Sequence, residues 1–296
     1  MSGIYDSVRV WKDLLTQGLE DDDWRWDWTT LGTIPADKKL RARVIAKSKG
    51  VWAASGLVEA VNQHDEAFRS GASSLVVRST IHDGDRIEPG QVVAEWQGNG
   101  RILLAMERPF LNLASYVSGI ATRTRGLVDL VKKACPQNTP RVTSTRKTLP
   151  GYRDLAIHGV IAGGGSSHRM SLSGGVLIKE NHIAGAGGVS LAIAGARAIA
   201  PHGLKIEIEV TSLQELQQAL DAGADVVMLD NFSPPQVLSA LDVVKRAARR
   251  PLIEVSGGLH EATIADYAIE GVDILSVGSL THSVQAVDLS LLVQSE

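Results

Sequence analysis

The chain has 296 residues, of which 44% are hydrophobic and 21% are charged, so it can bury a large core and lacks the composition of a disordered protein. Its formal net charge of −3 excludes a general nucleic-acid binder, because such a protein needs a broad positive face that releases counterions. The lone cysteine, Cys135, permits no internal disulfide, and no apolar run approaches the roughly 18 residues of a membrane span, so we expect a cytoplasmic protein without membrane contact.

The first part of the chain predicts an open α+β domain over residues 1–118. Apolar spacing indicates a helix over residues 7–19. The acidic, tryptophan-rich segment EDDDWRWDWTT at residues 20–30 has two interpretations, a half-buried edge strand or an interface patch. The patterns that follow predict, in order, strand 40–52, helix 54–70, strand 74–81, a turn-rich hairpin over 82–90 and strand 91–96.

A long helix is predicted over residues 105–134. Pro109 would fall in its first turn, where a missing backbone N–H is tolerated. Gly119 would let another backbone approach the helix closely. By themselves, Glu107 and Arg108 indicate no more than an exposed pair at the start of the helix.

From residue 141 onward, short β-prone runs alternate with helical stretches. The last four predicted strands begin roughly 20 to 26 residues apart, which is the length of one strand–helix unit and favours a parallel sheet. We therefore predict an α/β chain whose residues 119–280 form an incomplete TIM-like barrel, with a doubly wound open sheet as the alternative. Residues 281–296 are predicted to form a C-terminal helix that returns to the N-terminal domain. The predicted strands are 142–145, 175–178, 206–210, 226–229, 252–255 and 274–277, and the predicted helices are 212–222, 235–248 and 260–270.

Basic and polar residues recur at the ends of these predicted strands, where the active sites of α/β barrels lie. Random surface charges would instead scatter over helices and loops. The repeated position predicts a pocket for a strongly anionic ligand, with Gly-rich turns that can offer backbone N–H groups to a phosphate. The strand-end residues are Arg146, Lys147, Lys179, Asp230, Ser256, Gly257, Gly258 and Gly278, and the loop between the first two of these strands adds His168 and Arg169.

The strand IEIEV adds carboxylates to this pocket. Its period-two alternation places Glu207 and Glu209 on one face and the apolar residues on the other. If the apolar face meets the outer helices, both glutamates point into the barrel, where the basic residues can pair with them. An edge strand with both glutamates in solvent is the alternative. Inward carboxylates beside basic residues and glycine turns predict a pocket for a phosphorylated sugar.

Three other kinds of site are excluded. The triple glycine 163–165 lacks the strand–GxGxxG–helix context of a dinucleotide-binding turn, and the chain contains no Walker A motif and no Ser/His/Asp signature.

Several ordered motifs resemble the nicotinate-nucleotide pyrophosphorylases, also called quinolinate phosphoribosyltransferases. The resemblance covers nearly the whole chain and is strongest from Glu107 to Gly278. It is carried by TRKTLPGYRDL, GGGSSHRMSL, VLIKENHI, EIEVTSLQEL, GADVVMLDNFSP and VSGGL, and by ERPFLNLASYVSGIATRT upstream, which is similar to the family's dimer helix.

The resemblance implies a decarboxylating transfer in NAD biosynthesis, in which quinolinate and phosphoribosyl pyrophosphate give nicotinate mononucleotide, pyrophosphate and CO₂ with Mg²⁺ as cofactor. It also implies a homodimer in which Arg108 reaches the neighbouring subunit's site. By motif position, Arg146, His168, Arg169 and Lys179 would bind quinolinate. Lys147, Glu209 and Asp230 would be catalytic and would handle the phosphoribosyl group, with Glu209 and Asp230 also serving the metal. Ser256, Gly257, Gly258 and Gly278 would hold the 5-phosphate.

One segment departs from the family pattern. EDDDWRWDWTT replaces a glycine-bearing acidic turn, although Asp27, Thr29 and Thr30 keep the final Asp-x-Thr-Thr. This departure concerns the N-terminal loop and the dimer contact, and the predicted site residues are unaffected.

Two alternative functions stay open on the sequence alone: a phosphoribosyltransferase of the same fold that acts on another heteroaromatic acid, and a binding protein related to the molybdenum-transport-associated proteins of this fold.

Overall fold

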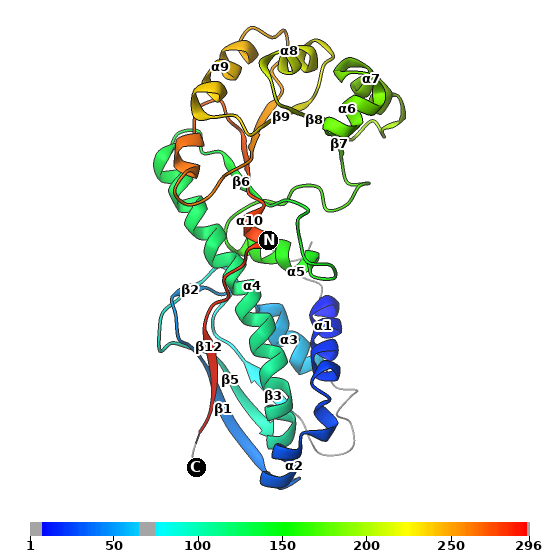
Figure 1. Ribbon diagram of the computed structural model, residues 1–296. Coiled ribbons are helices and arrows are strands. Elements are labelled where there is room, and N and C mark those ends of the chain that lie inside the picture. Colours follow the sequence, from blue (N-terminus) through cyan, green and yellow to red (C-terminus); the bar gives the residue numbers. More distant parts are fainter. Residues whose placement is uncertain (1–7, 65–74, 295–296) are drawn as a thin grey trace. The chain divides into compact units, whose positions relative to one another are not determined.

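The computed structural model describes residues 8–64 and 75–294, and Figure 1 shows its elements in chain order. The chain divides into two compact units. The N-terminal unit comprises Met1–Arg125, Leu149–Gly164 and Ser283–Glu296, and the barrel unit comprises Gly126–Thr148 and Gly165–His282. The sequence predicts a barrel over all of 119–280, whereas residues 149–164 belong to the N-terminal unit.

The N-terminal unit is built on an antiparallel sheet of four strands in the order β12-β1-β5-β3. Three helices, α1 (Val8–Asp21), α3 (Ser55–Gln63) and α4 (Gly100–Ala134), contribute buried apolar side chains to its core. The predicted helix 54–70 extends past α3 into residues 65–74, which lie outside the described residues. The strands of this unit are β1 (Lys39–Ala46), β2 (Gly50–Val51), β3 (Leu75–Arg78), β4 (Arg86–Ile87), β5 (Val92–Asn99) and β12 (Leu289–Val293).

The C-terminal segment is a strand, so the predicted C-terminal helix is wrong. β12 pairs antiparallel with β1, and in Figure 1 the red strand runs beside the blue one. The sequence LSLLV follows a period of two, because Leu289 and Leu291 are buried whereas Leu292 is exposed. The expected return of the C-terminus to the N-terminal domain is confirmed, through strand pairing.

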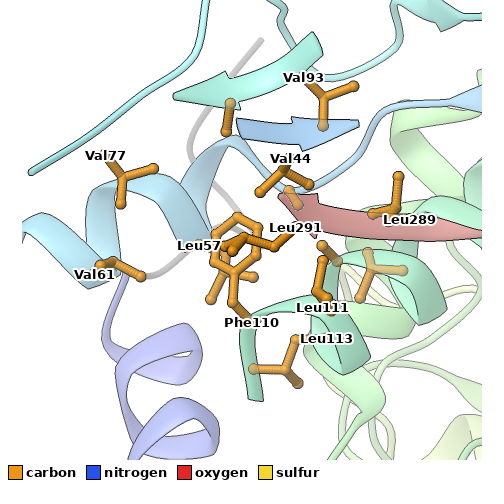
Figure 2. Packing of buried hydrophobic residues seen from close by; sticks show 14 of the residues in the cluster. Val44, Leu57, Val61, Val77, Val93, Phe110, Leu111, Leu113, Leu289 and Leu291 are labelled. Atoms are coloured by element: carbon orange, nitrogen blue, oxygen red, sulfur yellow. The ribbon is translucent and has the colours of Figure 1, made fainter. Parts of the chain in front are cut away.

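The core of the N-terminal unit lies between this sheet and its helices. Trp96 from β5 meets Phe110 from α4 edge to face, with ring centroids 4.9 Å apart, an arrangement favoured by aromatic quadrupoles. Figure 2 shows Phe110 among Leu57, Leu111 and Leu291, so residues far apart in the sequence share one core.

The tryptophan-rich segment is helical, and its interpretation as an edge strand is wrong. It contains a 3₁₀ turn, Trp24–Trp26, followed by α2 (Trp28–Thr33). Asp27 caps α2 by accepting a hydrogen bond from the Thr30 backbone N–H at 3.0 Å. Hydrogen bonds from the Thr30 side chain and then from its backbone lower the pKa of Asp27. The Asp-x-Thr-Thr pattern is therefore a helix start. Trp26 and Trp28 are 59% and 74% exposed.

The long helix α4 begins earlier than predicted, so Pro109 lies inside the helix rather than in its first turn. The reason is Asn99, whose side chain accepts hydrogen bonds from the backbone N–H groups of Arg101 and Ile102. The predicted close approach at Gly119 is confirmed, because a Cβ there would overlap the backbone carbonyl of Gln285. At Gly163, likewise, a Cβ would meet Ala121 and Thr124 of α4, so this part of the triple glycine serves helix packing in the same unit.

The barrel unit contains six parallel strands in the order β6-β11-β10-β9-β8-β7, which confirms the predicted α/β architecture as an incomplete barrel. All six predicted strands are present. They are β6 (Arg141–Thr143), β7 (Val176–Ile178), β8 (Ile206–Val210), β9 (Val226–Asp230), β10 (Leu252–Ser256) and β11 (Ile274–Ser276).

Helices connect most of these strands. Two of them begin at capping serines, because Ser212 accepts from the Glu215 backbone N–H and Ser233 forms a capping box with Gln236. The predicted helix 260–270 is wrong, since only a 3₁₀ turn, η2 (Ile264–Tyr267), forms there. Thr263 Oγ1 donates instead to the Gly258 carbonyl at 3.0 Å. The helices of the barrel unit are α6 (Glu180–Ala186), α7 (Val189–Ile199), α8 (Leu213–Asp221), α9 (Pro234–Val244) and α10 (Ser279–His282), and α5 (Arg153–Ala162) belongs to the N-terminal unit.

Within residues 8–64 and 75–294, no single helix is both long enough and apolar enough to span a membrane. Helices α6 and α7 reach that length and composition only when they are taken together, and they are bent by 92° relative to each other.

Candidate active site

The predicted polar residues of the barrel unit gather at the carboxyl ends of its strands. In the parallel ladder Asp230 is paired with Ser256, and Ser256 with Ser276, so the last residues of β9, β10 and β11 are neighbours. Lys179 directly follows β7, and Arg146 and Lys147 follow β6. Consecutive parallel strands therefore deliver these side chains to one edge of the sheet, as the sequence predicted.

Lys179, Glu209 and Asp230 form a charged cluster at this edge. Lys179 Nζ contacts Glu209 Oε2 at 2.5 Å. Burial and the negative charge of Glu209 raise the pKa of Asp230, against the opposing effects of Asn231, Lys179 and Lys147. Glu209 and Asp230 are thus close enough to repel each other, which makes the pair suited to a cation or to sugar hydroxyls.

Arg146 and Arg169 bring two guanidinium groups together nearby. Burial and the positive charge of Arg146 lower the pKa of Arg169. The Nε atom of each is buried and, within the described part of the chain, has no hydrogen-bond partner. Adjacent cations with unused donors are suited to an anion that can accept from both.

His168 and His182 play supporting roles toward these cations. His168 Nδ1 accepts the backbone N–H of Arg169 at 2.8 Å, and His182 Nδ1 accepts that of Lys179 at 3.0 Å. The second contact fixes the backbone of Lys179 at the start of α6. The first assigns the ring proton of His168 to Nε2, because Nδ1 must keep its lone pair.

Both glutamates of β8 face this cluster, so the alternative with both in solvent is wrong. Glu207 is 8% exposed, and its carboxylate lies 3.4 Å from His168 Nε2. Burial disfavours a charge on His168, but the hydrogen bond and charge of Glu207, followed by the charge of Glu254, outweigh burial and raise the pKa of His168. The N–H of Arg169 at Nδ1 opposes a second ring proton.

Glu254 is a site residue that the sequence reasoning missed. It lies in the middle of β10, 1% exposed, and its Oε1 is 3.6 Å from His168 Nε2. Burial, then the charge of Glu207, raise its pKa to about 8. The available signal was a lone carboxylate in the apolar strand LIEV, two residues before Ser256 and therefore on the same face of the strand.

The ligand atoms of His168, Glu207 and Glu254 lie within 4.8 Å of one another, a spacing that could also hold a metal ion. The hydrogen bonding argues against that use, because Nε2 of His168 carries the ring proton and so has no lone pair for a metal. We therefore assign the three side chains to a hydrogen-bonded cluster.

The glycine turns adopt backbone conformations that other residues rarely reach. Gly257 and Gly258 have φ angles of +97° and +64°, and a Cβ on Gly257 would clash with Asn231. Gly278 lies between two side chains, since its Cβ would be 3.3 Å from both Lys147 Cδ and His282 Nε2. His282 was also missed, although it follows Gly278 by one helical turn in SVGSLTHS.

Arg108 is exposed on α4 and belongs to the N-terminal unit, and the structure contains a single chain. The expectation that it reaches another subunit's site therefore stays a prediction. The other predicted site residues all belong to the barrel unit.

Comparison with known proteins identifies the family. Residues 27–118 match the N-terminal domain of quinolinate phosphoribosyl transferase, and residues 120–292 match its C-terminal domain. The nicotinate-nucleotide pyrophosphorylase (carboxylating) of Mycobacterium leprae is 39% identical over 290 residues, with 97% of each chain covered. The probable enzyme of that name from Methanocaldococcus jannaschii is 38% identical, with 94% of this chain and 95% of the relative covered.

A solved structure shows the same likeness in three dimensions. The nicotinate-nucleotide pyrophosphorylase from Francisella tularensis superimposes with a TM-score of 0.87 at 32% sequence identity, covering 99% of this chain and 100% of that one. Two domain matches and full-length relatives therefore point to the same family. This chain therefore belongs to the quinolinate phosphoribosyltransferase family.

Proposed function

We propose that this chain transfers the phosphoribosyl group of phosphoribosyl pyrophosphate to quinolinate and releases pyrophosphate and CO₂, forming nicotinate mononucleotide in NAD biosynthesis. The observation that carries the proposal is a set of charged groups at one edge of the barrel sheet. Two guanidinium groups whose buried Nε atoms have no hydrogen-bond partner among the described residues lie there with the Lys179–Glu209 ion pair and the carboxylate of Asp230. A phosphosugar and a dianionic ring need these groups side by side.

Quinolinate carries carboxylates on neighbouring ring carbons, and the basic residues suit this pattern. Guanidinium groups match carboxylates with paired N–H donors, so Arg146 and Arg169 would bind one carboxylate each. Lys179 would add a point charge, and His168 would hold Arg169 through its backbone. These charges also favour the ring orientation in which the pyridine nitrogen faces the sugar.

The acids and glycine turns suit the second substrate. Glu209 and Asp230 would bind the ribose hydroxyls and stabilise the positive charge that develops as pyrophosphate leaves. Ser256, Gly257, Gly258 and Gly278 would bind the 5-phosphate through N–H and hydroxyl donors. Lys147, beside Gly278, would neutralise charge on the departing pyrophosphate.

The reaction then needs no protein nucleophile. The ring nitrogen forms a bond to the sugar C1 as the bond from C1 to pyrophosphate breaks. The carboxylate next to the positively charged nitrogen leaves as CO₂, its electron pair stays on the ring carbon, and that carbon takes up a proton. A positive pocket that excludes water favours both steps.

The direct test is to incubate the protein with quinolinate, phosphoribosyl pyrophosphate and Mg²⁺, and to measure pyrophosphate and CO₂ together. Equal release of both is expected. Competition with pyridine monocarboxylates separates this function from transfer to another heteroaromatic acid, because one carboxylate leaves an arginine unpaired. Absence of both products, with neither substrate binding in calorimetry, would indicate the binding-protein alternative.

Mg²⁺ is the proposed cofactor, and the donor set fits it. Glu209 and Asp230 supply hard carboxylate oxygens. Burial and then the charge of Glu209 raise the pKa of Asp230, and a cation would relieve the repulsion between the two carboxylates. When bound, Mg²⁺ offsets the charge of the leaving pyrophosphate. We expect calorimetric Mg²⁺ binding in the presence of phosphoribosyl pyrophosphate to weaken in Asp230→Asn. Unchanged binding in that variant would remove Asp230 from the metal site.

A homodimer is proposed as the smallest active unit, with Arg108 acting on the neighbouring subunit's site. Mixing inactive Arg108→Ala and Lys147→Ala chains, with unfolding and refolding, is expected to restore about a quarter of wild-type activity, because half of the dimers would be mixed and each would hold one intact site. Mixing Lys147→Ala with Glu209→Ala is the control, since both residues serve their own chain's site. No recovery in the first mixture would contradict the cross-subunit role.

We further propose a cytoplasmic location, which cell fractionation would check.

A further inference from the structure

Glu254, close to His168 and Arg169, is a buried acid that the proposed reaction does not use. Glu254 Oε1 accepts a hydrogen bond from Ser276 Oγ at 2.5 Å and lies 3.6 Å from His168 Nε2. Glu207 approaches the same nitrogen to 3.4 Å. Two carboxylates and one ring N–H therefore share a space with almost no access to solvent.

The donors in this space are too few for two charged carboxylates. His168 offers one proton at Nε2, because its Nδ1 accepts the backbone N–H of Arg169, and Ser276 offers one more. Two carboxylates in contact away from water strongly disfavour being ionised together. Glu254 is the more buried of the two, at 1% against 8% exposed for Glu207. A proton on Glu254 also supports a hydrogen bond between it and Glu207.

His168 connects this buried pair to the substrate side. Its Nε2 faces the two acids and its Nδ1 holds the backbone of Arg169. The guanidinium of Arg169 is fixed at one end, where Nη1 donates to the Gly175 carbonyl at 2.8 Å, and its buried Nε has no partner among the described residues. Any shift of His168 therefore moves an arginine that has one donor ready for a ligand.

We propose that Glu254 is a positioning residue that acts as a neutral carboxylic acid, fixing His168 and, through it, Arg169 against a carboxylate of the pyridine substrate. This inference rests on the proposed function. It gives the acid no contact with either substrate, so its effect should appear in quinolinate binding rather than in the handling of phosphoribosyl pyrophosphate.

Two variants separate a neutral acid from a charged one. Glu254→Gln keeps the size, one acceptor and a donor, so kcat and both KM values should stay within about threefold of the wild type. Glu254→Leu removes the acceptor of the Ser276 hydroxyl and one of the two acids beside His168 Nε2, which keeps only Glu207. We expect it to raise the KM of quinolinate about tenfold or more while the KM of phosphoribosyl pyrophosphate changes less than about threefold.

An infrared difference spectrum between wild type and Glu254→Gln supplies a readout that does not depend on activity or on the leucine variant folding. A carbonyl band of a protonated carboxylic acid, present at pH 7 in the wild type and lost in the variant, is expected, in line with the pKa of about 8 for Glu254. Absence of that band, loss of activity in Glu254→Gln as large as in Glu254→Leu, or equal rises of both KM values would overturn the inference. Inactive wild type would instead count against the proposed function, and the infrared result would still decide the protonation of Glu254.

Discussion

Replacing Lys147 by alanine is expected to lower kcat by about 10²- to 10³-fold, the usual cost of removing one electrostatic contact to developing charge. Lys147 lies at the carboxyl end of β6, next to Gly278, and its charge acts on Asp230. Its ammonium is therefore placed among the groups proposed to bind the pyrophosphate and the sugar. Pyrophosphate release in a single turnover measures the effect on the chemical step. Glu209→Ala is expected to fall in the same range.

The fold should persist in Lys147→Ala, because the side chain is exposed. Lys205→Ala is the matched control: Lys205 is also an exposed lysine of the barrel unit, but it precedes β8 and so lies at the amino end of a strand. Its turnover should equal that of the wild type. Near-normal turnover in both Lys147→Ala and Glu209→Ala, with unchanged circular dichroism, would remove these residues from the site.

Replacing Gly119 by alanine is expected to destabilise the N-terminal unit by about 3 kcal/mol, the upper part of the range for overpacking a buried site. The added methyl would overlap the carbonyl oxygen of Gln285 and lie 3.0 Å from the Ala286 Cα. Both are backbone atoms of the segment that leads to β12, so no side-chain rotation relieves the clash. The urea midpoint of the transition of this unit should fall accordingly.

Gly126→Ala provides the control in the same helix. Gly126 is exposed, and a Cβ there meets nothing within 4 Å. Alanine should therefore stabilise α4 by roughly 0.5–1 kcal/mol through its higher helix propensity. Equal effects of the two substitutions would show that the approach of residues 285 and 286 does not constrain Gly119.

Short apolar runs and the residues that bound them predicted the strands of the barrel unit well. Its strands are short and buried on both faces, so each appears in the sequence as an apolar run between turn or cap residues such as Ser212 and Ser233. Because parallel strands deliver their carboxyl ends to one edge, the polar residues there could be grouped from their positions in the sequence alone. The resemblance to the family then supplied the substrate class.

The errors have two physical sources. Residues 20–30 and 260–270 differ from the predictions because side-chain hydrogen bonds select local conformations that periodicity does not predict. Asp27 accepts from the Thr30 backbone N–H, and Thr263 donates to the Gly258 carbonyl. The C-terminal strand was missed for another reason. Its five residues are stabilised by pairing with β1, which lies more than 240 positions earlier in the chain. The local sequence around residues 289–293 therefore does not indicate the pairing.

By itself the sequence determined the α/β architecture, the family and the set of charged residues at the strand ends, because these depend on period, spacing and residue type. Only the tertiary structure decided which charges meet. It brought Glu254 of β10 to Glu207 of β8 and to His168 from a loop, and it placed His282 beside Gly278. Contacts of this kind depend on which side chains share a layer inside the barrel, and that depends on the register of β8, β9 and β10, which periodicity within one strand does not fix.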